Sequence, residues 1–73
     1  MRQFRIEKGK FNPKQFYARR MELGLTLEQI AALVGRRKAT IHYWELGKAT
    51  PRPAVLYLLS QVLQVKPGFF FQP

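Results

Sequence analysis

One stretch of the sequence, residues 26–47, constrains the fold more than any other; it reads TLEQIAALVGRRKATIHYWELG. Apolar residues recur at helical spacing on both sides of Gly35, which predicts two short helices over 27–34 and 38–46. Gly35 can take the positive φ that a sharp turn between helices requires. Ala31 is small enough to let the two helices approach closely. The stretch therefore predicts a helix-turn-helix.

The second of these helices has two different faces. Ile41 and Trp44 form its inward face, because they lie three residues apart. The opposite face carries Lys38, Ala39, His42 and Tyr43, preceded by Arg36 and Arg37. Cations beside small, polar and aromatic side chains suit a nucleic acid, in which charged phosphates flank base pairs whose edges side chains can recognise. An ordinary antiparallel helix pair is the alternative, but it does not explain why the glycine, the small alanine and the basic outer face coincide.

The composition limits the size of the protein and the class of its partners. With 73 residues, 47% of them hydrophobic, the chain has room for one small folded domain. Thirteen Lys and Arg against four Asp and Glu give a net charge of +9, which indicates an anionic partner, nucleic acid before a membrane surface. The chain has no cysteine and no apolar run long enough for a membrane span or a signal peptide. We therefore expect a cytoplasmic protein that does not enter a membrane.

Start and stop signals divide the rest of the chain into short helices. Residues 1–11 are predicted as a basic arm or a short strand, and residues 12–73 as the folded domain. A helix from 13 to about 23 follows an Asn-Pro start signal and ends at a glycine. The most apolar helix spans roughly 52–64, and its inward residues are expected to be Val55, Leu58, Leu59, Val62 and Leu63. The predicted fold class is all-α, a compact bundle of four to five short helices.

Two charged residues are predicted to pair inside the domain. Arg20 and Glu45 each lie on a helix face that is otherwise apolar. A buried charge needs a partner, and these two have opposite signs. We therefore predict an Arg20–Glu45 ion pair that joins the first helix to the helix over 38–46.

The run Phe69, Phe70 and Phe71 near the end of the chain has two interpretations. It either closes the core or forms a subunit interface, and we expect at least one of the three side chains in a dimer contact. Phe4 and Ile6 are the second candidates for that contact.

Together these residues resemble the phage-repressor/Cro-like (XRE-type) helix-turn-helix family. The matching positions are Arg20, the Leu23-Gly24-Leu25-Thr26 turn, Ile30-Ala31, Val34-Gly35, Ile41, the Trp44-Glu45-x-Gly47 ending and Pro51. The resemblance covers about residues 12–71. It implies a five-helix domain, similar to the lambda-repressor DNA-binding domain, that binds operator DNA as a dimer and in which an Arg/Glu pair recurs.

The resemblance also implies roles for single residues. It places Lys38, Ala39, Thr40 and Tyr43 on the side that reads bases in the major groove. It assigns phosphate contacts to Thr26, Leu27, Gly47 and Lys48, and to these we add three exposed cations, Arg36, Arg37 and Arg52. The sequence departs from the family pattern at Leu27, where a polar residue is common, and at Arg36 and Arg37, which replace a small or apolar residue and a Ser/Thr cap.

The leading hypothesis for function is a sequence-specific regulator of transcription that binds double-stranded DNA, a dimeric repressor or Cro-like protein of phage or bacterial type. The first alternative is an antitoxin-like protein whose main role is to bind a protein partner. General binding to RNA or to an acidic membrane is a third possibility, and it would not discriminate between DNA sequences.

An enzyme is not expected. Glu7, Glu22, Glu28 and Glu45 form no inward-facing acid pair, and the sequence has no cysteine nucleophile and no glycine-rich phosphate loop. His42 and Glu45 have helical spacing for a metal, but no third ligand accompanies them. We therefore expect no cofactor and no metal.

Overall fold

Helices make up the regular structure of residues 10–72, which are the residues that the computed structural model describes. They are α2 (Pro13–Glu22), α3 (Leu27–Val34), α4 (Lys38–Leu46), α5 (Pro53–Val62) and the short 3-10 helix η1 (Pro67–Phe71). Within this range there is no strand, so the predicted all-α class is confirmed. Most of the predicted arm or strand, together with Phe4 and Ile6, lies outside the described residues.

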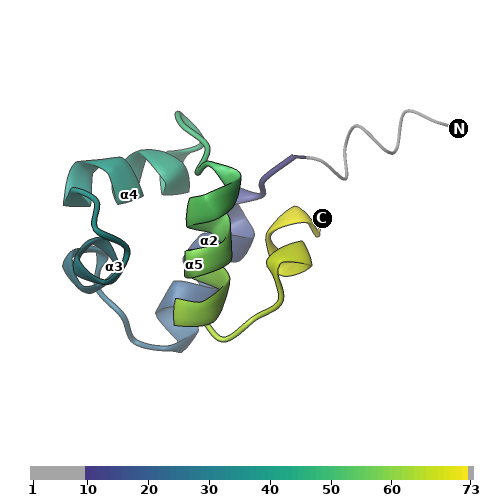
Figure 1. Ribbon diagram of the computed structural model, residues 1–73, viewed down its shortest axis with the longest axis horizontal. Coiled ribbons are helices and arrows are strands. Elements are labelled where there is room, and N and C mark those ends of the chain that lie inside the picture. Colours follow the sequence, from purple (N-terminus) through teal and green to yellow (C-terminus); the bar gives the residue numbers. More distant parts are fainter. Residues whose placement is uncertain (1–9, 73) are drawn as a thin grey trace, which may run out of the picture.

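The helices are arranged around α5 and α2. In Figure 1, α5 crosses in front of α2 at the centre, α3 and α4 lie together on one side, and η1 lies on the other. Helix α3 packs against both α4 and α5, while α2 packs against α4 and η1. The helix-turn-helix therefore packs against the rest of the domain through α3, which contacts α5, and through α4, which contacts α2.

Side-chain caps and glycines set the ends of the helices as the sequence predicts. The Asn12 side chain accepts a hydrogen bond from the Lys14 N–H at 3.0 Å. At the start of α3, the Thr26 hydroxyl accepts from the Gln29 N–H at 3.0 Å, and the Gln29 side chain accepts from the Thr26 N–H at 2.8 Å. This reciprocal capping satisfies two N–H groups that have no partner within the helix. Gly35 ends α3 with φ of +69°, a conformation that strains other residues.

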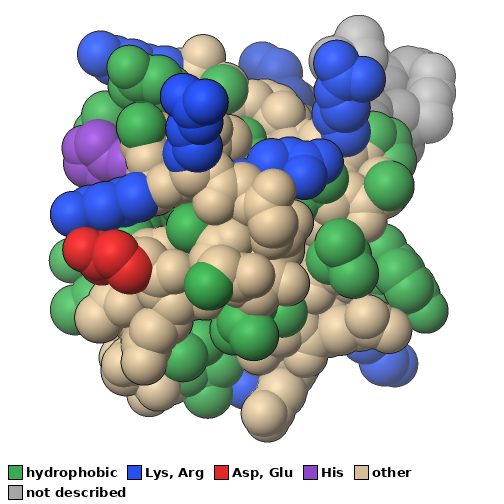
Figure 2. Space-filling model, turned by 60° about the vertical axis from the view of Figure 1, so that its left-hand side comes forward, with side chains coloured by type: hydrophobic (Ala, Val, Ile, Leu, Met, Phe, Trp, Pro, Cys, Tyr) green, Lys and Arg blue, Asp and Glu red, His purple; other side chains and the backbone are tan. Residues whose placement is uncertain are grey.

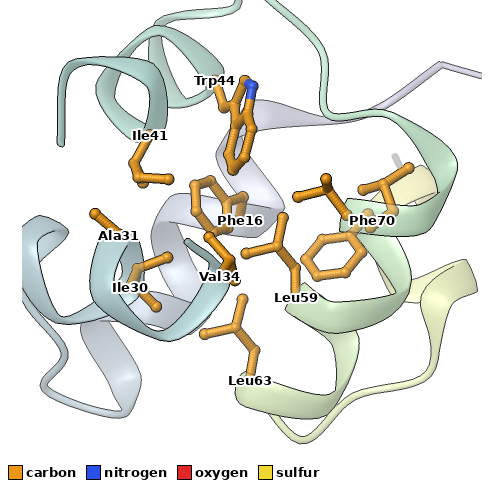
Figure 3. Packing of buried hydrophobic residues seen from close by; sticks show 11 residues of the cluster. Phe16, Ile30, Ala31, Val34, Ile41, Trp44, Leu59, Leu63 and Phe70 are labelled. Carbon is orange, nitrogen blue, oxygen red and sulfur yellow. The ribbon is translucent and has the colours of Figure 1, made fainter. Parts of the chain in front are cut away.

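The core lies where all five helices meet (Figure 3). Its fully buried side chains are Phe16, Ile30, Ile41, Leu59, Leu63 and Phe70. The Phe16 ring lies edge-on to both Trp44 and Phe70, with centroids 6.4 Å apart in each pair. Such edge-to-face pairs stabilise the packing beyond the area that they bury.

The structure corrects one prediction about the core and narrows another. Leu58 is 42% exposed, because Leu56 takes its place on the face of α5 that meets the core, beside Val55 and Leu59, which are buried as predicted. Phe70 is not available for a dimer contact, because its side chain is completely buried inside the domain. Of the three candidates, only Phe69 and Phe71 keep some accessible surface.

Phe11, predicted as the end of the arm, is part of the folded domain. Its ring lies 6.1 Å from that of Phe16 and 5.8 Å from that of Phe70. The next residue, Asn12, donates its backbone N–H to the Phe70 carbonyl oxygen. The start of α2 and η1 are thus joined to each other.

Candidate nucleic-acid interface

The helix-turn-helix forms as the sequence predicts. The inward residues of α3 are Ile30, Ala31 and Val34, and all three are buried. Ala31 and Ile41 lie at the junction of α3 and α4 (Figure 3). The turn at Gly35 is closed by the Arg36 N–H, which donates to the Ala31 carbonyl oxygen at 3.0 Å. Helix α4 therefore leaves the turn in a fixed direction, with one face inside and the other outside.

The predicted ion pair is present and fixes α4 against α2. Arg20 donates from Nε to one carboxylate oxygen of Glu45 and from Nη2 to the other, at 3.1 Å for the second bond. Its Nη1 donates to the Leu25 carbonyl oxygen at 2.8 Å, in the turn before α3. The relative exposures of the Arg20 and Glu45 side chains are only 10% and 7%. The Arg20 side chain, which comes from α2, thus contacts both α4 and the turn that precedes α3.

The outer face of α4 carries most of the predicted base-reading side chains. Lys38, Ala39 and Tyr43 are exposed there, with Tyr43 at 49%, and His42 lies among them. Thr40 differs from the others, because it is half-buried and lines a hollow between α4 and the start of α5. The structure therefore brings three of the four predicted base-reading residues to one face and places Thr40 at its edge.

An ion pair on this face was not predicted. Lys38 Nζ lies 3.0 Å from Oε2 of Glu28, so the starts of α4 and α3 are linked across the turn. The hydrogen bond from Lys38 is the largest cause that holds the pKa of the Glu28 carboxyl below its usual value, followed by a backbone hydrogen bond and the charge of Lys38. The sequence signal was the opposite charges at the starts of two consecutive helices.

The predicted phosphate-binding residues lie around the two ends of α4 and at the starts of α3 and α5. They are Thr26, Leu27, Arg36, Arg37, Gly47, Lys48 and Arg52, of which all but the half-buried Leu27 are exposed. Figure 2 shows Lys and Arg side chains gathered over the upper half of one face of the domain. Each carboxylate in residues 10–72 is paired with Arg19, Arg20 or Lys38. The four cations among the predicted phosphate-binding residues take part in no such pair. The surface around α4 is therefore positively charged.

Thr26 and Leu27 can each offer one donor. The Thr26 hydroxyl accepts from Gln29, which leaves its own hydrogen free to donate to a phosphate. Leu27 is the first residue of α3, where the backbone N–H has no partner within the helix. A helix N-terminus of this kind attracts anions.

Comparison with known proteins agrees with this geometry. Residues 16–70 match the family named Helix-turn-helix, HTH_3. This match spans most of the chain, and the protein belongs to that helix-turn-helix family. No curated protein matches the chain significantly.

Solved structures show the same fold. The DNA-binding domain of the P22 c2 repressor in solution superposes with a TM-score of 0.78 at 26% identity, over 84% of this chain and 80% of that one. The P22 c2 repressor in complex with synthetic operator 9T gives the same TM-score and identity, over 84% and 92% of the two chains. An HTH_3 family transcriptional regulator from Vibrio cholerae has 30% identity and a TM-score of 0.71, over 81% of this chain and 33% of that one.

No described helix is both long and apolar enough to cross a membrane. Among residues 10–72, no three His, Cys, Asp or Glu side chains gather as metal ligands would.

Proposed function

We propose that this protein is a transcriptional regulator that binds double-stranded DNA sequence-specifically with α4 in the major groove. The observation that carries the proposal is the exposed basic face of α4, in a helix-turn-helix whose inner face is fixed by the Arg20–Glu45 pair. The HTH_3 family and the P22 c2 repressor, at 26% identity, support a DNA-binding regulator. The repressor or Cro-like role, and a bacterial or phage origin with a cytoplasmic location, are part of the proposal.

In this proposal Lys38 reads a guanine and Ala39 contacts a thymine methyl group. A lysine ammonium has three donors, and the bond to Glu28 uses one of them. The other two can reach the N7 and O6 acceptors of guanine in the major groove. Tyr43 follows Ala39 by about one helical turn on the exposed face of α4 and can donate its hydroxyl to a base edge or a phosphate. Arg36, Arg37 and Lys48 hold the DNA backbone at the two ends of α4.

We propose further that the protein acts as a homodimer. One recognition helix contacts only a few base pairs, so useful specificity requires two half-sites about 10–10.5 base pairs apart or a multiple of that spacing. Among residues 10–72, Phe69 and Phe71 are the remaining candidates for the contact, because each is only half-buried in the domain. Sedimentation of the free protein and of its complex with DNA tests this part.

The experiment that tests sequence reading compares two variants on two DNAs. We first select the preferred site from a random DNA pool, and then measure binding to that site and to a scrambled duplex at several salt concentrations. Lys38→Ala should weaken the preferred site by about 1–3 kcal/mol and relax the preference at one base pair. Lys48→Ala, the matched control at the other end of α4, should weaken both duplexes alike and lower the salt slope by about one. Equal losses on both duplexes for Lys38→Ala would contradict the placement of α4 in the groove.

An antitoxin-like protein remains the second candidate, and one observation favours it. Tyr57 and Leu58 on α5 are 59% and 42% exposed, which is a surface suited to a protein partner. A toxin-sized reading frame beside the gene would support this function. A purified protein that shifts its own promoter DNA without a partner would support the DNA-binding regulator instead. We propose no enzymatic activity for either candidate.

A further inference from the structure

A hollow lies between α4 and the start of α5, beside the reading face. Two arginines, Arg36 and Arg52, line it together with Thr40, Thr50, Trp44 and two apolar residues, Pro51 and Val55. None of its lining residues is a carboxylate. The polar side chains of the hollow are therefore cations and groups that can donate hydrogen bonds, and none of them carries a negative charge.

The indole of Trp44 is the unusual member of this lining. Trp44 is only 4% exposed, yet no residue in the described range accepts a hydrogen bond from its Nε1. Figure 3 shows the nitrogen at the edge of the core cluster, on the side of the ring turned away from Phe16. Buried N–H groups nearly always have a partner in native proteins, and an indole N–H can only donate. An acceptor from outside the domain would supply that partner.

The start of α5 adds to the positive character of the hollow. Arg52 is the N-cap of this ten-residue helix, and its side chain makes no capping hydrogen bond. The unpaired N–H groups of a first helical turn carry a partial positive charge. Two guanidinium groups, two hydroxyls, an indole N–H and a helix N-terminus all favour an oxyanion over a neutral acceptor.

We propose that Trp44 donates its Nε1–H to a phosphate of the DNA backbone that enters this hollow. The inference rests on the proposed function, which brings DNA against α4. Arg36 and Arg52 neutralise the same phosphate, and Thr40 contacts it instead of a base. Because Trp44 also packs against Phe16 in the core, the contact ties the position of the DNA backbone to the position of α4.

The protein has a single tryptophan, so one signal reports on the proposed contact. In ¹H–¹⁵N NMR spectra the lone indole resonance should shift, and its exchange with solvent should slow, when the 73-residue protein is saturated with DNA. A phosphate is present in every sequence, so the preferred site and a scrambled duplex should both produce the shift. A shift with the preferred site alone would assign the indole to a base edge and overturn the proposal. So would an indole signal that does not change when DNA is bound.

A variant series measures the strength of the contact. Trp44→Phe keeps an aromatic ring and removes the donor, so both duplexes should bind roughly 10-fold to 100-fold more weakly, the loss of one hydrogen bond to a charged group. Ile41→Val, which alters the packing on the same inner face without removing a donor, is the control and should bind within about threefold of the wild type. Thermal melts of both variants establish that they are folded. If Trp44→Phe binds both duplexes as tightly as the wild type does, the proposal fails.

Chemically altered DNA identifies the acceptor. Uncharged methylphosphonates are placed one at a time along the preferred site, and at one position the substitution should weaken the wild type but leave Trp44→Phe unaffected. If the methylphosphonate and Trp44→Phe weaken binding independently of each other at every position, so that their losses of binding free energy add, the phosphate assignment is overturned. A different result would contradict the proposed function. If the wild-type protein binds both duplexes equally, it is not a sequence-specific regulator, but a shift of its indole resonance would still support the contact between Trp44 and a phosphate. A protein that binds no DNA would refute both.

Discussion

Replacing Glu45 by alanine tests how far the domain depends on one buried ion pair. The substitution removes both carboxylate oxygens that accept from Arg20. Arg20 would keep its bond to the Leu25 carbonyl oxygen and its position 5.5 Å from the centre of the Tyr17 ring. It would nevertheless carry a positive charge in a place where the residue is only 8% exposed. The variant therefore leaves a buried cation without a counter-ion.

The expected loss follows from this burial. Breaking one side of a buried pair typically costs about 3–5 kcal/mol, and the remaining bond to Leu25 favours the lower end, about 3 kcal/mol. Native domains have about 0.05–0.15 kcal/mol of stability per residue, which gives about 4–11 kcal/mol for a chain of 73 residues. The loss is therefore a large fraction of the total, and the melting temperature should fall by about 12 °C or more.

Urea melts of four proteins separate the pair from its surroundings. They are the wild type, Glu45→Ala, Arg20→Met and the double variant Arg20→Met/Glu45→Leu. The double variant should be about as stable as the wild type, because apolar residues of similar size often replace a buried pair without loss. A loss of less than about 1 kcal/mol in Glu45→Ala would refute the reasoning, since that is the size expected for a solvent-exposed pair.

Four further substitutions have outcomes that follow from the structure or, for Phe71, from the proposed dimer. The pKa of Glu28 is lowered in the folded protein, so its NMR titration should have a midpoint below 4.5, and Lys38→Met should raise that midpoint. The stability that the Lys38–Glu28 pair contributes is present above the pKa of Glu28 in the unfolded chain. It is lost as the pH falls through the pKa of Glu28 in the folded protein. Phe70→Ala should cost about 3–5 kcal/mol in a urea melt, because Phe70 is fully buried, whereas Phe71→Ser should weaken self-association in sedimentation more than it lowers stability. Gly47→Ala should cost about 1–2 kcal/mol in a thermal melt, because φ is +76° there.

The helices and their ends could be predicted from the sequence because local chemistry determines them. The Thr26/Gln29 capping box and the turn at Gly35 both depend on residues within a few positions of each other. The Arg20–Glu45 pair connects distant parts of the chain, yet it was predictable, because a charge on an otherwise apolar helix face requires a partner and only one of opposite sign was available on such a face.

What the sequence did not predict depends on how the elements meet. Leu58 and Leu56 are both apolar residues of α5, and only the direction from which the other helices approach decides that Leu56 is buried. The Lys38–Glu28 pair likewise depends on the angle at which α4 leaves the turn. Periodicity assigned Trp44 to the core, which is right for its ring, but it gives no information on whether the indole N–H has an acceptor.

The start of α4 shows a conflict between stability and the proposed function that can be measured. Arg37 has the extended backbone of an N-cap, with φ of −83° and ψ of 151°, and its side chain makes no capping bond. Its positive charge also lies at the positive end of the helix dipole. Serine at this position would accept from an N–H of the first turn, so Arg37→Ser should stabilise the domain by about 1 kcal/mol.

The same substitution should weaken DNA binding, because it removes a cation from the surface beside Lys38. Residues that oppose local stability are expected where function requires them, and stabilising substitutions at such positions reduce activity. Arg37→Ala is the control, since it removes the charge without adding a cap: it should bind DNA as weakly as Arg37→Ser but melt at a lower temperature. If Arg37→Ser is more stable and binds both duplexes as tightly as the wild type, Arg37 is not a DNA contact, and the missing cap at the start of α4 has no functional explanation.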